Sequence, residues 1–167
     1  MTIATKRVEL TNVPLFIGGK FVPAGAGKTF DNVNPATDEV IARIAEASAP
    51  DVDRAVRVAR QAFESGPWPR MAAAERARFL RKIADAMEAR KEELASLETI
   101  DTGKPIREAL SGDVPRALHY FRMYADYLTT QSTECFPMDD QALNYVLREP
   151  LGVAGLITPW NFPLMIL

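Results

Sequence analysis

The stretch EPLGVAGLITPWNFP, residues 149–163, decides the fold prediction. Residues 151–158 carry no charge and are mostly apolar, which predicts a strand buried on both faces in a parallel sheet. Residues 159–163 place prolines on both sides of Trp160-Asn161-Phe162, which predicts a loop at the carboxyl end of that strand. Ligands of open α/β sheets bind at such strand ends. The stretch therefore predicts the α/β class and marks a candidate binding loop.

The chain before this stretch predicts short strands first and helices afterwards. A hairpin is expected over 15–22, and two further strands are expected within 28–45, so the chain opens with a small β meander. Ser48 and Asp51 form a capping-box pattern that begins a helix, which residues 66–69 break. Longer helical patterns follow over about 72–102, stopped by glycine and proline, and over about 105–130, kinked by a proline; 131–140 is expected as loop and 143–149 as strand.

The predicted parallel strand finds no partner strand in these 167 residues. A β meander, three helices and one buried strand do not close a sheet. We therefore expect the sequence to be an incomplete domain, the N-terminal part of a larger α/β protein.

Composition excludes several function classes. Twenty basic residues against 22 acidic ones give a net charge of −2, which provides no attraction for nucleic acid. One cysteine and one histidine exclude a disulfide framework and a zinc finger, and no metal site is expected. Residues 1–10 lack the apolar core of a secretory signal, and the prolines and glycines of 150–167 argue against a membrane span, so a cytoplasmic protein is expected.

Four blocks in order carry a family resemblance: FIGG at 16–19, NPAT at 34–37, ETIDTGKP at 98–105, and EPLGV at 149–153 running into PWNFP. Together they resemble the N-terminal portion of the NAD(P)-dependent aldehyde dehydrogenase superfamily. The resemblance implies a meander and helices of the cofactor-binding domain over 1–140, an oligomerisation-type strand over 141–149, and the first strand and Pro-Trp-Asn loop of a truncated Rossmann-like sheet over 150–167.

The resemblance also implies the reaction. A cysteine thiolate adds to an aldehyde, hydride passes to NAD or NADP, and a glutamate activates the water that releases the acid. Both residues are expected beyond Leu167, so the chain alone is expected to be inactive. The full enzyme is expected to form a homo-oligomer, a dimer or a tetramer. One alternative is a non-catalytic fragment that associates with a full-length subunit, and another is a related acyl-phosphate- or acyl-CoA-forming reductase.

Asn161 is the candidate catalytic residue. Addition to an aldehyde carbonyl creates an oxyanion, and a neutral amide donor stabilises that charge without quenching the nucleophile. The prolines at 159 and 163 restrict the loop on either side of the amide. The alternative is a turn asparagine that hydrogen-bonds within its own loop.

The cofactor residues follow from the resemblance, because the sequence has no GxGxxG fingerprint. By resemblance, the backbone at Ile157 and Thr158 lies against the adenosine half of the dinucleotide, and Pro159 and Trp160 lie nearer the nicotinamide. Ile157 and Trp160 are also open to interpretation as plain core residues.

Arg116 is the candidate for substrate selection. In DVPRA, residues 113–117, it lies on the helix that faces the aldehyde tunnel in the family, where a guanidinium would match a carboxylate. This block, with STECFPMD at 132–139, is similar to the 2-hydroxymuconate and 2-aminomuconate semialdehyde dehydrogenases of aromatic catabolism, whose substrates carry carboxylate. The alternatives are a solvated arginine or one paired with Asp113. Phe162 is a second candidate tunnel residue, or plain core.

Two other residues are tempting and are set aside. Cys135 has no matching motif and lies far upstream of the position of the family's nucleophile, so an ordinary thiol is expected. Asp101 and the Val33 carbonyl resemble an occasional monovalent-cation site of the family, although local pairing of Asp101 is the simpler expectation.

Overall fold

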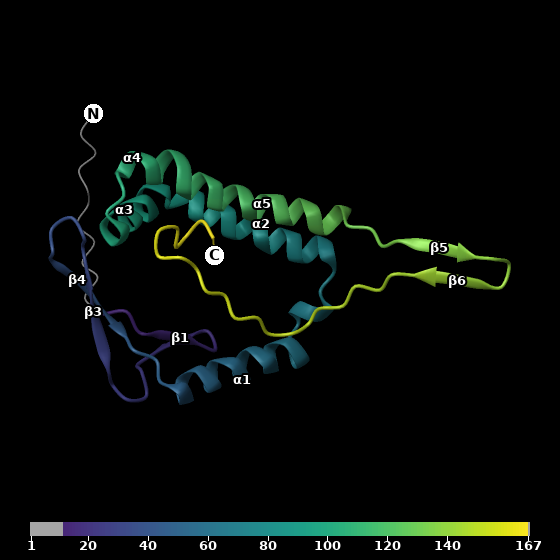
Figure 1. Cartoon of the computed structure of the whole chain (residues 1–167), viewed down its shortest axis with the longest axis horizontal. Helices are drawn as coiled ribbons and strands as arrows, with labels where there is room; N and C mark the ends of the chain where they lie inside the picture. The colour runs from purple at the N-terminus through teal and green to yellow at the C-terminus, as the bar shows by residue number, and fades with distance from the viewer. Residues whose placement is uncertain (1–11, 167) are drawn as a thin grey trace.

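The computed structural model describes residues 12–166, and the N-terminal stretch whose sequence predicts no secretory signal lies outside these described residues (Figure 1). The chain opens with two antiparallel hairpins, as predicted. They are β1 (Leu15–Ile17) with β2 (Lys20–Val22), and β3 (Thr29–Val33) with β4 (Val40–Ala45). The hairpins form two separate two-stranded sheets and not one continuous meander, because β2 and β3 do not pair with each other.

Helix α1 (Ala49–Ser65) begins at the predicted capping box. Both the backbone N–H and the hydroxyl of Ser48 donate to one Asp51 carboxylate oxygen, at 2.9 and 2.7 Å. The same carboxylate accepts the Gly25 N–H at 3.1 Å, so it ties the loop after β2 to the start of the helix. Helix α1 ends at Gly66 and leads into the short η1 turn (Trp68–Arg70), which confirms the predicted break.

The long helix expected over 72–102 is wrong in one respect: the chain forms two helices, α2 (Ala73–Ala89) and α3 (Lys91–Thr102). Arg90 leaves helical geometry at φ −114° and ψ 21°, and its guanidinium donates to Glu93 at 2.6 and 2.9 Å. The residues at this break, Arg90 and Lys91, are charged residues that are equally common inside a helix. The apolar spacing therefore did not reveal the break between α2 and α3.

The predicted stop of α3 is confirmed. Gly103 adopts the left-handed conformation at φ 75°, and its N–H bonds to the Thr99 carbonyl at 3.0 Å. The next helical stretch runs through α4 (Ile106–Glu108), a π-helical turn η2 (Ala109–Asp113) and α5 (Val114–Thr130). Pro115 has no N–H to donate, and the wider turn lies directly before it, at the place where a kink was expected.

The core lies where α2 and α5 run side by side and α3 and η2 close one end (Figure 1). Its buried members are mostly small, which lets the helix backbones approach closely; they are Ala84, Ala95, Ala109, Val114 and Leu118. Phe79 and Ile83 of α2 lie outside this core and are 47% and 43% exposed, and the Phe79 ring packs edge-on against Trp68 of η1.

Two corrections concern the chain after α5. Residues 131–140, expected as loop, contain β5 (Cys135–Met138), which pairs antiparallel with β6 (Ala142–Tyr145). Residues 151–158, expected as a buried strand, form no strand and are largely exposed. A strand requires a neighbour for its ladder, and no described strand lies beside this segment.

The last segment runs back from the β5–β6 hairpin toward the helices, where Leu164 packs against the core (Figure 1). This return carries residues 159–166 to the α3–α5 end of the molecule. No helix among residues 12–166 combines the length and the apolar character needed to cross a bilayer.

Candidate functional site

The loop at 159–163 is folded into compact turns. The Phe162 N–H donates to the Pro159 carbonyl at 3.2 Å, and the Ile166 N–H donates to the Phe162 carbonyl at 3.3 Å. A cavity of about 340 Å³ separates the loop from the β3–β4 turn and the end of α3. Its lining includes Thr158, Pro159 and Trp160 on one side, and Val33, Pro35 and Asp101 on the other. The loop therefore borders an open space while its own backbone stays ordered.

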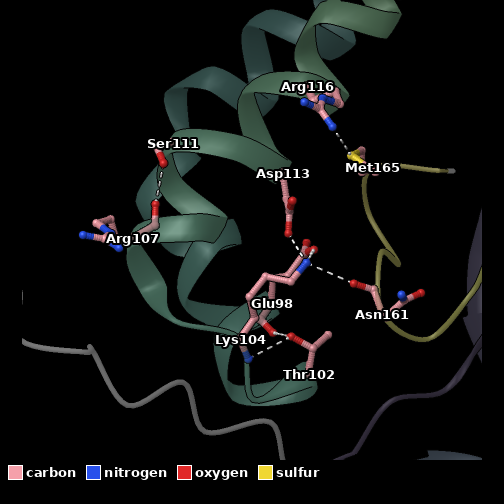
Figure 2. Close-up of polar contacts among 9 residues, drawn as sticks. All are labelled: Glu98, Thr102, Lys104, Arg107, Ser111, Asp113, Arg116, Asn161 and Met165. Atoms are coloured by element: carbon pink, nitrogen blue, oxygen red, sulfur yellow. Dashed lines mark hydrogen bonds and ion pairs between the residues drawn. The ribbon is translucent and has the colours of Figure 1, made fainter.

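The Asn161 side chain is exposed and points away from the helices, whereas its backbone carbonyl points toward them (Figure 2). Among residues 12–166, no hydrogen bond engages the Asn161 amide, so the turn-asparagine alternative finds no contact here. A free amide on an ordered loop is able to donate to a ligand oxygen. The catalytic role of Asn161 stays a prediction.

A buried charge cluster lies behind the loop. The Lys104 ammonium, on the turn after α3, pairs with Asp113 at the end of η2 and lies 3.8 Å from Glu98 on α3. It also donates to the Asn161 carbonyl at 3.0 Å and lies 4.1 Å from the centre of the Phe162 ring (Figure 2). One cation thus joins three segments of the chain to the candidate loop.

Glu98 is the most buried member of this cluster, with its side chain 2% exposed. Burial is the main cause that raises the pKa of Glu98 to about 7, and the hydrogen bond and charge of Asp113 add to it, while the Lys104 charge opposes it. When Glu98 is ionised, neither of its carboxylate oxygens accepts a hydrogen bond from any of the described residues. Two ionised carboxylates cannot donate to each other, so the contact with Asp113 becomes a hydrogen bond when Glu98 is protonated.

Arg116 lies on the exposed side of α5, with its guanidinium 3.9 Å from the Met165 sulfur (Figure 2). Within residues 12–166 no carboxylate pairs with it, and Asp113, the expected alternative partner, pairs with Lys104 instead. Met165 belongs to the lining of an apolar cavity of about 570 Å³ between α5 and the C-terminal segment, together with Ala117, Tyr120 and Leu164. The guanidinium therefore lies at the margin of this cavity without a counter-ion.

The predicted cofactor residues are accessible. Ile157 is 98% exposed and Trp160 is 81% exposed, so neither is a core residue within the described part of the chain. No backbone hydrogen bond among the described residues engages Ile157 or Thr158. Free backbone groups beside an open cavity fit the edge of a bound dinucleotide, but Ile157 does not line the cavity that the next three residues line.

The structure brings Asn161 and Phe162 together at the Lys104 cluster, and it places Arg116 apart, at the second cavity. Sequence reasoning missed the roles of Lys104, Glu98 and Asp113. Two of them, Glu98 and Lys104, stand in the ETIDTGKP block. A glutamate and a lysine within one block were the sequence pattern that could have indicated an ion pair.

No group of residues in the described part of the chain is arranged to hold a metal ion. The expected local pairing of Asp101 is wrong, because its carboxylate accepts a hydrogen bond from the side-chain amide of Asn32 on β3, 69 residues away, at 2.7 Å. Cys135 is a free, exposed thiol on β5, away from the loop.

Comparison with known proteins gives a consistent result. Residues 21–167 match the model of the aldehyde dehydrogenase family. The chain is 46% identical to aldehyde dehydrogenase family 2 member B4 of Arabidopsis thaliana, covering 98% of this chain and 30% of the relative. It is 45% identical to 2-hydroxymuconic semialdehyde dehydrogenase of Pseudomonas sp. strain CF600, covering 91% of this chain and 32% of that relative.

Solved structures agree with the sequence matches. The NAD⁺ complex of aldehyde dehydrogenase from Bacillus cereus superposes with a TM-score of 0.89 at 47% identity, covering 92% of this chain and 31% of that chain. The chain therefore spans about a third of the length of the relatives that it matches.

Proposed function

Because the chain belongs to the aldehyde dehydrogenase family, we propose that the complete enzyme containing these residues oxidises an aldehyde to its carboxylic acid with NAD or NADP. The observation that carries the proposal is the free Asn161 amide, exposed on a loop whose backbone is held from behind. In this proposal the amide donates to the aldehyde oxygen as that oxygen becomes negative. Such a donor contributes more in the transition state than in the ground state, so it accelerates the chemistry.

The cofactor proposal has its own support. The unbonded backbone of Ile157 and Thr158 and the exposed faces of Pro159 and Trp160 provide a surface against which a dinucleotide would lie. When bound, the nicotinamide supplies the hydride acceptor. The solved relative from Bacillus cereus binds NAD⁺, which favours NAD as the first cofactor to test.

The test of the catalytic proposal is Asn161→Ala in the complete enzyme. Loss of one oxyanion donor lowers kcat by about 100- to 1000-fold, and the KM for the aldehyde changes little. Gln61→Ala, which removes an exposed amide from α1, is the matched control and should leave kcat unchanged. A kcat for Asn161→Ala within about twofold of the unmodified enzyme would remove the amide from the reaction.

For the substrate, we propose an aldehyde that carries a carboxylate, such as 2-hydroxymuconic semialdehyde. The support is the unpaired guanidinium of Arg116 at the margin of the apolar 570 Å³ cavity, together with the 45% identity to a 2-hydroxymuconic semialdehyde dehydrogenase. A guanidinium beside an apolar cavity favours an anionic ligand, because a carboxylate accepts two hydrogen bonds from it. Phe162, whose ring lies 4.1 Å from the Lys104 ammonium, is the second residue that we propose for the aldehyde's path.

The substrate proposal is tested by comparing two aldehydes. Arg116→Ala should lower kcat/KM for the carboxylated aldehyde by about 10- to 100-fold, the range of a charge-assisted hydrogen bond, and for a neutral aldehyde by less than about threefold. Arg122→Ala removes another arginine of α5, one that already pairs with Asp85 and Glu88, and serves as the control. Equal losses on both aldehydes would place Arg116 outside the pocket.

We also propose that the complete enzyme is a cytoplasmic homo-oligomer that assembles through the β5–β6 hairpin. Both strands are exposed along their whole length, and the hairpin reaches away from the helices (Figure 1). Exposed apolar strands favour pairing with another chain. The exposed free thiol of Cys135 suits a reducing compartment. Sedimentation of the complete enzyme with and without Leu143→Lys measures the assembly, and unchanged oligomers in the variant would contradict this interface.

A further inference from the structure

We propose that Lys104 is a positioning residue: its ammonium, aimed by Asp113 and Glu98, holds the Asn161 peptide so that the Asn161 amide faces the open side of the loop. This inference rests on the proposed function for its catalytic consequence. The tether itself stands on the geometry of the described residues alone.

The three donors of the ammonium account for the arrangement. An ammonium has three N–H groups, and here one is directed to Asp113, one to the Asn161 carbonyl at 3.0 Å, and the remaining positive face lies over the Phe162 ring at 4.1 Å. The Lys104 side chain is only 15% exposed, and that of Asp113 is 10% exposed. A cation this enclosed has few alternative partners, so it does not exchange its contacts for water as a surface lysine does.

The hydrogen bond from Lys104 to the Asn161 carbonyl restrains the whole peptide group and not the oxygen alone. The Asn161 carbonyl belongs to the rigid peptide plane that joins Asn161 to Phe162, so a hydrogen bond to its oxygen restrains the ψ angle of Asn161. With the carbonyl turned toward the helices, the side chain projects to the other side, as Figure 2 shows. The ring contact with the following residue restrains the same plane from its other end.

The two carboxylates have different tasks in this arrangement. Asp113 makes the direct pair, and it is carried by the π-helical turn η2, whose end is packed in the core beside Val114. Glu98 lies 3.8 Å from the ammonium on α3. The position of the ammonium is therefore set by η2 and α3. Through the ammonium, the helical core fixes the position of the loop, which its own short turns do not fix.

The first experiment measures the tether in the chain as it is, by amide hydrogen exchange. The double variant Lys104→Met/Asp113→Asn removes the cation and its direct partner together, and exchange is measured at pH 6, where the pKa of about 7 keeps the remaining buried carboxyl, Glu98, mostly protonated. Exchange at the Phe162 and Ile166 amides should become at least about 10-fold faster, while the amides of α5 keep their rates. Arg122→Met, which removes an exposed arginine with two carboxylate partners, is the matched control and should change none of them.

If the double variant loses protection throughout α5, it has unfolded, and Phe162→Leu decides. That variant keeps all three charges and removes only the ring from the ammonium, so exchange at Ile166 should rise by about threefold. Loop exchange within the error of the unmodified chain in every folded variant would overturn the proposal.

The second experiment uses the complete enzyme and separates positioning from bulk structure. A misplacement of about 1 Å costs on the order of 100-fold in rate, so the double variant should lose about that factor in kcat while the KM for the aldehyde and the binding of NAD change less than about threefold. A kcat equal to that of the unmodified enzyme would overturn the positioning role. An unmodified enzyme that oxidises no aldehyde would instead reject the proposed function, and the exchange result would still decide the tether.

Discussion

Replacing Glu98 by glutamine should remove a pH dependence from the stability of the chain. The pKa of Glu98 is raised from 4.5 to about 7, chiefly by burial on α3. The folded chain therefore holds a proton on Glu98 over a range in which the unfolded chain has released it. The stabilisation from this protonation is complete below pH 4.5 and is lost as the pH rises through 7.

The magnitude follows from the same two pKa values. One pKa unit corresponds to about 1.36 kcal/mol, so the upper limit of the loss between pH 4.5 and pH 7 is about 3 kcal/mol of unfolding free energy. Glutamine is neutral at every pH and keeps the shape of the side chain. The variant loses only the attraction between ionised Glu98 and Lys104 across 3.8 Å. We therefore expect the unfolding free energy of Glu98→Gln to be about 1–3 kcal/mol higher than that of the unmodified chain at pH 8.

The assay is urea unfolding followed by circular dichroism at pH 5, 6, 7 and 8 and constant ionic strength. The quantity of interest is the difference in unfolding free energy between Glu98→Gln and the unmodified chain, because the other titrating groups contribute equally to both. That difference should grow from pH 5 to about pH 7 and level off toward pH 8, where Glu98 is ionised in both the folded and the unfolded chain. Glu92→Gln neutralises an exposed carboxylate of the same helix and should give a constant difference. A constant difference for Glu98→Gln as well would refute the raised pKa.

Three other substitutions test separate parts of the fold. Gly103→Ala should lose at least about 1–2 kcal/mol in urea unfolding, because φ is 75° and the new methyl would lie 2.9 Å from Pro35. Gly112→Ala, whose methyl meets open space within a helical turn, should instead gain up to about 1 kcal/mol in the same measurement. Asp51→Asn should weaken the chain at neutral pH, because the Ser48 and Gly25 hydrogen bonds lower the pKa of Asp51 and stabilise its ionised form. The difference between the two chains should shrink as the pH falls below 3.8 and acid protonates Asp51 in the folded chain. Acid titration of ellipticity in both chains checks this, and parallel curves would contradict it.

The features that the sequence predicted well are those with local causes. The Ser48–Asp51 capping box, the glycine turn between β1 and β2 and the stop at Gly103 each depend on residues within a few positions of one another. The same holds for α5, where Val114 and Leu118 stand four residues apart, a helical spacing, and are both buried. Local chemistry decides such elements before any tertiary contact forms.

The features that the sequence did not predict depend on partners far away in the chain. Whether residues 151–158 form a strand depends on neighbouring strands, and apolar composition carries no information about their presence. The pair of Lys104 with Asp113 and its reach to Asn161 join positions up to 57 residues apart. Spacing rules for a single helix or strand do not describe such contacts. The block that contains Lys104 was therefore recognised from the sequence, whereas the contacts of Lys104 were not.

The candidate site was predicted in part. The PWNFP loop lies beside a cavity, and the Asn161 amide has no hydrogen-bond partner among the described residues, while its catalytic role stays a prediction. The separation of Arg116 from that loop came only with the fold, because it depends on how the C-terminal segment returns along α5.

The exposed run at 151–158 also makes the chain vulnerable to proteases. An extended segment without backbone partners fits a protease cleft, whereas the packed helices do not. A single cut there would detach the Asn161 loop from the β5–β6 hairpin and leave α2 and α5 intact. A far-ultraviolet spectrum of the cut chain would still report folded helices, although the Asn161 loop would no longer be joined to the hairpin by the backbone.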